Sequence, residues 1–184
     1  MILQELERCE DTAIRNLEAG PNWHLMDSAL DDWCNHENLK SLVRQFHDWL
    51  KTQIAPGDLK ALRREPHVEM RKWIVAPIVT AFVYQLAKRR GAADSVADRL
   101  ARFPSVTGAF ISALFGLAIH WLAFGGIEGA DPKELSGDLN DMEYVIFGSL
   151  SHSFASLDKR AVAICELVRT AFAYRRQLPT LISS

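Results

Sequence analysis

The apolar residues of the first fifty positions recur at the spacing of α-helices. One run covers residues 2–19 and stops at Gly20-Pro21, and a second covers residues 29–50 and is closed by Pro56-Gly57. Because residues three and four positions apart share one face of a helix, each run predicts a helix with one buried side. The second run is either one long helix or two shorter helices separated near Asn35.

Helical spacing continues through the middle of the chain, where residues that break helices interrupt it. The run over residues 65–90 contains Pro77, which removes a backbone hydrogen bond and predicts a kink or a break into two helices. Basic residues followed by Gly91 are typical of a helix C-terminus. We then expect Asp94 to cap a short helix that ends before Pro104.

Residues 109–127 form a long apolar segment without a charged residue. A helix opened by Pro104-Ser105 and closed by Gly125-Gly126 would contain most of them. By length and composition it could be a transmembrane span or a helix in the core of a domain. Ser112 and His120 favour the core, where a histidine finds a hydrogen-bond partner. We therefore predict a buried central helix and no membrane span.

The last third of the chain mixes helix and strand patterns. We expect a polar loop over residues 128–137, a helix over 139–150, a short strand over 153–157, a helix over 159–174 and a final short strand over 180–182. The whole pattern predicts a helix-rich α/β fold with few and short strands.

Composition indicates one soluble domain. The 184 residues are 48% hydrophobic and 24% charged, which is ordinary for a soluble globular protein. The net charge is −2, so the overall charge does not indicate nucleic-acid binding. The three cysteines, Cys9, Cys34 and Cys165, show no metal-binding spacing and fit reduced thiols of a cytoplasmic protein. We predict an N-terminal helix over residues 1–20 and a core over 21–182.

Acidic residues within residues 137–160 are the main candidates for chemistry. Asp138 and Asp141 lie one helical turn apart at an expected helix start, and Asp158 follows the expected strand. Capping alone would explain the first two, because helix N-termini favour acidic side chains. If all three converge, they repel one another unless a counter-charge is present. A bound Mg²⁺ or Mn²⁺ would supply it, because hard cations prefer carboxylate oxygens.

The same stretch resembles the C-terminal half of PIN-like nuclease domains. It reads Gly-Asp-Leu-Asn-Asp-Met-Glu-Tyr over residues 137–144, continues as an apolar run, and then reads Phe-Ala-Ser-Leu-Asp-Lys-Arg over residues 154–160. In that family, an acidic helix start precedes a strand that ends in Thr/Ser-x-Asp-Lys/Arg and is followed by a helix. The similarity covers residues 103–182.

The resemblance assigns roles to individual residues. Ser156 and Asp158 match the Thr/Ser and Asp of the strand end, Lys159-Arg160 match the basic residues after it, and Asp138 or Asp141 matches the preceding acid. It implies that Asp138, Asp141 and Asp158 are catalytic and bind Mg²⁺ or Mn²⁺, and that Ser156, Lys159 and Arg160 contact the substrate.

Further metal ligands are implied in the first half of the chain. The family begins with an apolar strand that ends in a metal-binding Asp, for which residues 23–27 and Asp27 are the candidates; the same residues could equally begin a helix. Glu69 is the candidate for an acid contributed by an intervening helix. His152 stands where many members have an Asp, and it either orients a phosphate or a water molecule or is a solvent-facing loop residue.

The resemblance implies a three-layer fold in which helices flank a small parallel sheet. It also implies a metal-dependent ribonuclease of a bacterial toxin or defence module, with RNA as substrate. The alternative is an all-α bundle without activity that binds a protein partner or a second copy of itself. Close approach of Asp138, Asp141 and Asp158 would favour the nuclease, and wide separation would favour the interaction domain.

Overall fold

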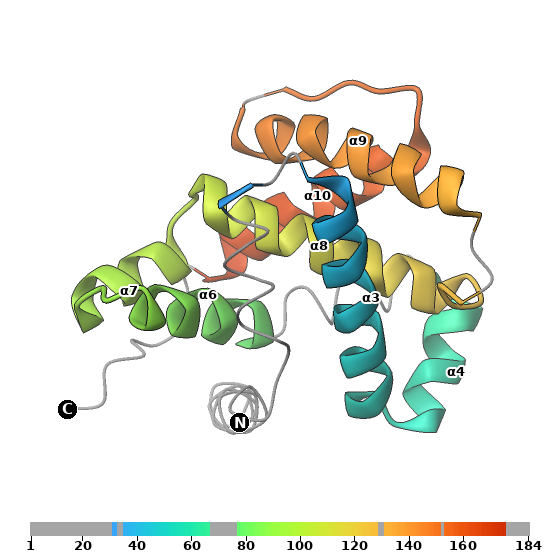
Figure 1. Cartoon of the computed structure of the whole chain (residues 1–184), viewed down its shortest axis with the longest axis horizontal. Coiled ribbons are helices and arrows are strands. Elements are labelled where there is room, and N and C mark those ends of the chain that lie inside the picture. The colour runs from blue at the N-terminus through green and yellow to red at the C-terminus, as the bar shows by residue number, and fades with distance from the viewer. Residues whose placement is uncertain (1–30, 33–34, 67–76, 129–130, 152, 176–184) are drawn as a thin grey trace.

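The computed structural model describes residues 31–32, 35–66, 77–128, 131–151 and 153–175. Within these ranges the chain forms seven α-helices and no β-strand (Figure 1). The helices are α3 (His36–Gln53), α4 (Pro56–Arg64), α6 (Pro77–Arg89), α7 (Asp94–Arg102), α8 (Val106–Ala123), α9 (Pro132–Leu150) and α10 (Lys159–Arg175). The helix-rich prediction is confirmed, and the described residues fit the all-α alternative rather than the α/β arrangement.

Helix α8 is the centre of the structure and contacts α3, α4, α6, α9 and α10 (Figure 1). Ser105 caps its N-terminus, where its Oγ accepts a hydrogen bond from Gly108 N (3.0 Å). Gly125 and Gly126 follow its C-terminus with φ angles of 113° and 98°, a conformation that favours glycine. The helix therefore begins and ends where the sequence predicted.

Helix α8 is buried because other helices cover most of its surface. Its Phe115 stacks on Phe46 of α3 at a centroid distance of 4.2 Å and meets Phe82 of α6 edge-on at 5.4 Å. Among the described helices, α8 is the one long and apolar enough to cross a membrane, yet 83% of that segment is buried inside the structure. The predicted buried central helix is confirmed.

The helices around α8 follow most of the predicted breaks. Asn35 caps α3, with its Oδ1 accepting a hydrogen bond from Asn38 N (3.3 Å), and α6 begins at Pro77. The predicted cap of α7 is wrong, because Asp94 is the first residue of that helix. Its carboxylate instead binds Lys88 Nζ (2.6 Å) and accepts a hydrogen bond from the Tyr84 hydroxyl (3.1 Å).

Helix α9 begins earlier than the sequence pattern predicted. The loop expected over residues 128–137 ends at Asp131, whose side chain accepts a hydrogen bond from the backbone N–H two residues later (2.9 Å). Pro132 follows in the first turn, where the N–H that proline lacks would have no helical partner. Asp138 and Asp141 are therefore inside the helix, and neither caps it.

The strand predicted over residues 153–157 is wrong, because this segment is a loop between α9 and α10. A short strand is stable only beside a partner strand, and the described part of the chain contains none. The other two predicted strands, over residues 23–27 and 180–182, lie outside the described residues.

The loop between α9 and α10 packs back on α9. A Cβ at position 148 would overlap the Phe154 ring, so Gly148 permits this close contact. Arg169 of α10 donates from Nη2 to the carbonyl oxygens of Gly148 (2.7 Å) and Ser151 (3.0 Å). These contacts fix α10 beside α9, so its first turn faces the middle of α9.

Candidate functional site

Asp138 is buried where α8, α9 and α10 meet. Its Oδ2 accepts a hydrogen bond from Trp121 Nε1 (3.1 Å), and its Oδ1 accepts one from Arg160 Nη1. Burial raises the pKa of Asp138 above the usual value for aspartate, while the charge of Arg160 and both hydrogen bonds oppose that shift. Asp138 is only 5% exposed, so its attraction to the guanidinium is weakly screened by water.

Arg160 connects the three helices at this point. It lies in the first turn of α10, and its Nη2 is 3.2 Å from Glu134 Oε1 on α9. Its guanidinium carbon lies 5.7 Å from the centre of the Trp121 ring on α8, within the range of a cation–π interaction. The family resemblance implied that Arg160 contacts the substrate. In the structure, its guanidinium group forms ion pairs with Asp138 and Glu134.

Asp158 caps helix α10. Its Oδ1 accepts hydrogen bonds from the backbone N–H groups of Arg160 (2.6 Å) and Ala161 (3.2 Å), which have no partner within the helix. Ser156 Oγ accepts a hydrogen bond from Asp158 N (3.1 Å). Ser156 therefore helps to form the turn that presents Asp158.

Asp141 lies one turn after Asp138 on α9 and meets Asp158 across the helix junction. Burial raises the pKa of Asp141, and the negative charge of the nearby Asp158 raises it further. Two carboxylates this near repel each other when both are ionised. A cation near both carboxylates would offset this repulsion.

The three predicted acidic residues form two neighbouring arrangements at one junction. Asp138 pairs with Arg160, while Asp141 lies near enough to Asp158 for that charge to raise the pKa of Asp141. Within the described ranges, they are not a group in which three ligand atoms all lie within 4.8 Å of one another. The counter-charge of Asp138 is an arginine, which leaves the pair of Asp141 and Asp158 as the place for an added cation.

Three of the remaining predicted site residues, Asp27, Glu69 and His152, lie outside the described residues. Lys159 is exposed at the start of α10, directly after Asp158. An exposed lysine at this position is compatible with the predicted contact to a phosphate backbone.

Two residues of the junction were not predicted from the sequence. Trp121 belongs to the predicted buried helix and is 7% exposed, but its Nε1 also donates a hydrogen bond to Asp138. Glu134 was placed in a loop, and it is on α9, one turn before Asp138. The Asp-Pro pair at residues 131–132 is the sequence signal that would have revealed the earlier helix start.

The pH dependence of stability is expected to report on the pair of Asp141 and Asp158. The raised pKa of Asp141 means that the folded state binds the proton more tightly than the unfolded state, whose reference value is 3.8. This contribution is complete below pH 3.8 and is lost as the pH rises through the folded pKa. Asp141→Asn should therefore be more stable than the wild type at pH 7, and the difference should shrink on acidification.

Urea unfolding of both proteins from pH 3 to pH 8 measures this difference. Asp138 also has a raised pKa, but it is present in both proteins and cancels in the comparison. A stability difference that does not change with pH would contradict the close contact of Asp141 with Asp158.

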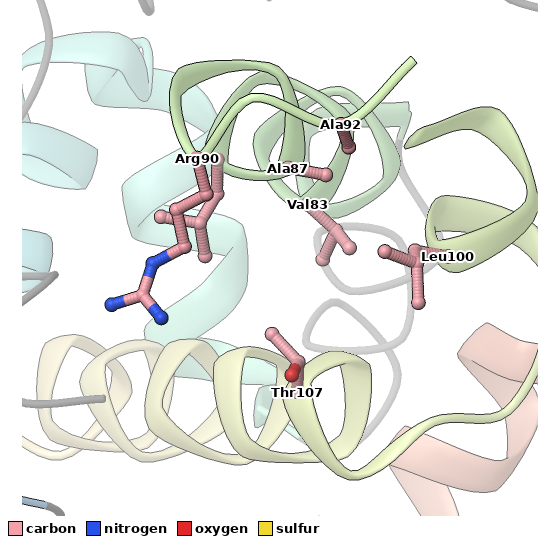
Figure 2. A pocket seen from close by; sticks show the side chains of 7 residues that line it. Val83, Ala87, Arg90, Ala92, Leu100 and Thr107 are labelled. Carbon is pink, nitrogen blue, oxygen red and sulfur yellow. The ribbon is translucent and has the colours of Figure 1, made fainter. Parts of the chain in front are cut away.

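A cavity of about 200 Å³ lies apart from this junction, among α6, α7 and α8 (Figure 2). Its walls are mostly apolar, and they include Val83, Ala87 and Leu100. The Arg90 side chain extends away from Leu100 in Figure 2, and its Nη2 hydrogen-bonds Asp31 Oδ1 (3.0 Å). Among the described residues that line the cavity, no set of side chains is suited to acid–base or metal chemistry.

Comparisons of the chain with protein-family models, curated proteins and solved structures found no match.

Proposed function

We propose that the chain is a metal-dependent ribonuclease of the PIN-like type, acting in a bacterial toxin or defence module and using Mg²⁺ or Mn²⁺. The nearness of Asp141 to Asp158 carries this proposal, because Asp141 lies one turn after Asp138, which binds Arg160, and Asp158 caps the helix turn that contains Arg160. Asp141 is on α9 and Asp158 precedes α10, and their mutual repulsion favours a bound cation. Their donor set, one half-buried and one exposed carboxylate, suits Mg²⁺ and Mn²⁺.

The other residues of the junction position this pair. Both oxygens of Asp138 accept hydrogen bonds, so Asp138 orients Arg160 instead of holding the metal. Asp158 is fixed by the backbone of α10. Lys159 is exposed beside it and would hold a phosphate of the RNA.

The reaction requires a water oxygen to bond to phosphorus while the bond to the leaving ribose oxygen breaks. A bound Mg²⁺ or Mn²⁺ would acidify that water and offset the phosphate charge. Asp141 and Asp158 would hold the cation with their carboxylate oxygens, and the proton lost by water would reach the leaving oxygen through solvent.

Mn²⁺ is expected to raise the melting temperature of the wild type. A ligand at one hundred times its Kd stabilises the folded state by about 2.7 kcal/mol, because it binds only that state. Asp141→Asn and Asp158→Asn should each lose most of this stabilisation. Asparagine still caps a helix, so the second variant keeps α10 intact. Thermal unfolding with increasing MnCl₂ measures the effect.

Glu166→Gln is the matched control, because Glu166 is an exposed acid on α10. It should respond to Mn²⁺ as the wild type does. Equal shifts in all four proteins would mean that Mn²⁺ binds elsewhere, and this would count against the proposed site.

A second function is supported by exposed aromatic residues. Tyr144 and Phe147 are 69% and 56% exposed on one side of α9. This surface suits a helical interaction domain that binds a protein partner or forms a homodimer. Such a domain would show no Mn²⁺ stabilisation that depends on Asp141 and Asp158, so the same titration distinguishes the two functions.

A further inference from the structure

A second group of potential metal ligands lies where α3 meets the loop after α8. His47, Asp48 and Glu128 each offer one ligand atom, and these three atoms all lie within 4.8 Å of one another. His47 is 1% exposed, whereas the two carboxylates are open to solvent. No spacing in the sequence reveals this group, because Glu128 is brought to α3 by the fold.

The hydrogen bonds of His47 indicate a neutral ring. Its Nε2 faces Ile127 N at 3.4 Å, and a backbone N–H can donate only to a nitrogen without a proton. The proton is then on Nδ1, which lies 3.0 Å from Asp48 Oδ1 and donates to it. Neutral imidazole is the form that binds metals, and a carboxylate at the other nitrogen is the usual device that orients it.

The backbone leaves room beside this ring. Gly126 has a φ of 98°, and a Cβ at this position would overlap Glu128 Oε2 and lie 3.6 Å from His47 Nε2. The Glu128 carboxylate therefore occupies space that exists because residue 126 is glycine. Its oxygen and the histidine nitrogen both border that space.

We propose that His47 Nε2 and the Glu128 carboxylate bind a zinc-class divalent cation, with Asp48 orienting the ring through Nδ1, at a place separate from the proposed nuclease site. The cation would take the Nε2 lone pair in place of the 3.4 Å contact from Ile127 N. An imidazole nitrogen and a carboxylate oxygen are ligands that Zn²⁺ uses, and water completes the coordination. The buried ring supplies a fixed ligand, and the exposed Glu128 carboxylate needs only to turn toward it.

Lys51 places a positive charge beside this group. Its Nζ is 3.0 Å from Glu128 Oε1, and this ion pair lowers the pKa of Glu128. The ammonium group holds Glu128 ionised in the absence of metal and competes with a cation for it. Removing Lys51 should therefore tighten metal binding.

Zn²⁺ titration of the full-length protein by calorimetry tests the site, with Co²⁺ absorbance as a second readout of coordination by nitrogen. Glu128→Gln and Asp48→Asn should each weaken Zn²⁺ binding by at least about tenfold. Lys51→Met should strengthen it. These three residues are exposed, so the variants should fold.

Asp58→Asn, which removes an exposed acid on α4, and Asp141→Asn, which removes an acid of the other site, should bind Zn²⁺ as the wild type does. Absence of Zn²⁺ binding, or binding that Glu128→Gln and Asp48→Asn leave unchanged, would overturn the proposal. Loss of Mn²⁺ stabilisation with retained Zn²⁺ binding would overturn the nuclease site alone.

Discussion

Replacement of Arg160 by methionine is expected to lower the free energy of unfolding by about 3 kcal/mol. For a domain of this size, the melting temperature should fall by roughly 6 to 12 °C. Methionine has nearly the same helix propensity as arginine and can still pack on Trp121. The loss therefore measures what happens to the buried carboxylate of Asp138, which would have Trp121 as its remaining hydrogen-bond donor.

The size of this effect follows from burial. An exposed ion pair contributes little, and the contact of Arg160 with Glu134, whose side chain is 50% exposed, belongs to that class. The Asp138 side chain is 6% exposed, and a charge in such a place is costly once its partner is gone.

Two variants separate this explanation from a general effect of losing an arginine. Arg63→Met removes an exposed arginine from α4 and should change stability by less than about 0.5 kcal/mol. Combining Arg160→Met with Asp138→Asn should restore most of the lost stability, since the unpaired charge is then absent. Urea unfolding measures all four proteins. An Arg160→Met variant as stable as the wild type would contradict the buried ion pair.

Most helix boundaries could be predicted because they depend on nearby residues. Ser105 and Asn35 cap helices through side-chain oxygens, and Gly125-Gly126 end α8 through positive φ angles. Capping and positive φ angles act within one or two helical turns, so they can be predicted from residues that are close in the sequence. Asp94 was wrongly predicted to cap α7, because its carboxylate interacts with Lys88 and Tyr84 on the neighbouring helix α6.

The strand prediction failed for a different reason. Residues 153–157 are a short run of apolar and small polar residues between two helices, but a strand forms only if another segment supplies its hydrogen bonds. The sequence of these five residues does not reveal whether a partner strand exists elsewhere in the chain. In the structure, the contact between Phe154 and Gly148 on α9 fixes the position of the loop instead.

The candidate site was predictable as a set of residues and not as an arrangement. Asp138, Asp141 and Asp158 could be chosen because carboxylates that lie close together repel one another, so such a group indicates a bound counter-charge. Which acid faces Arg160 depends on the rotation of α9 about its axis, and that rotation is set by packing on α8. The group around His47 depends on contacts between distant segments and left no local signal.

RNA cleavage in Mn²⁺ is expected to fall at least about 100-fold in Asp141→Asn and in Asp158→Asn. A factor of 100 corresponds to about 2.7 kcal/mol of transition-state stabilisation, which is within what a bound metal contributes. Each substitution removes a charged oxygen from the pair but keeps the shape of the side chain. Glu166→Gln should cleave at the wild-type rate. Chelation of the metal should abolish cleavage by the wild type and by Glu166→Gln.

The most direct test is a single-turnover cleavage assay on labelled RNA, comparing the wild type with Asp158→Asn at several Mn²⁺ concentrations. The proposed function predicts cleavage by the wild type that rises with Mn²⁺ and a rate at least about 100-fold lower in the variant at every concentration. Equal background cleavage by both proteins, with or without Mn²⁺, would contradict it.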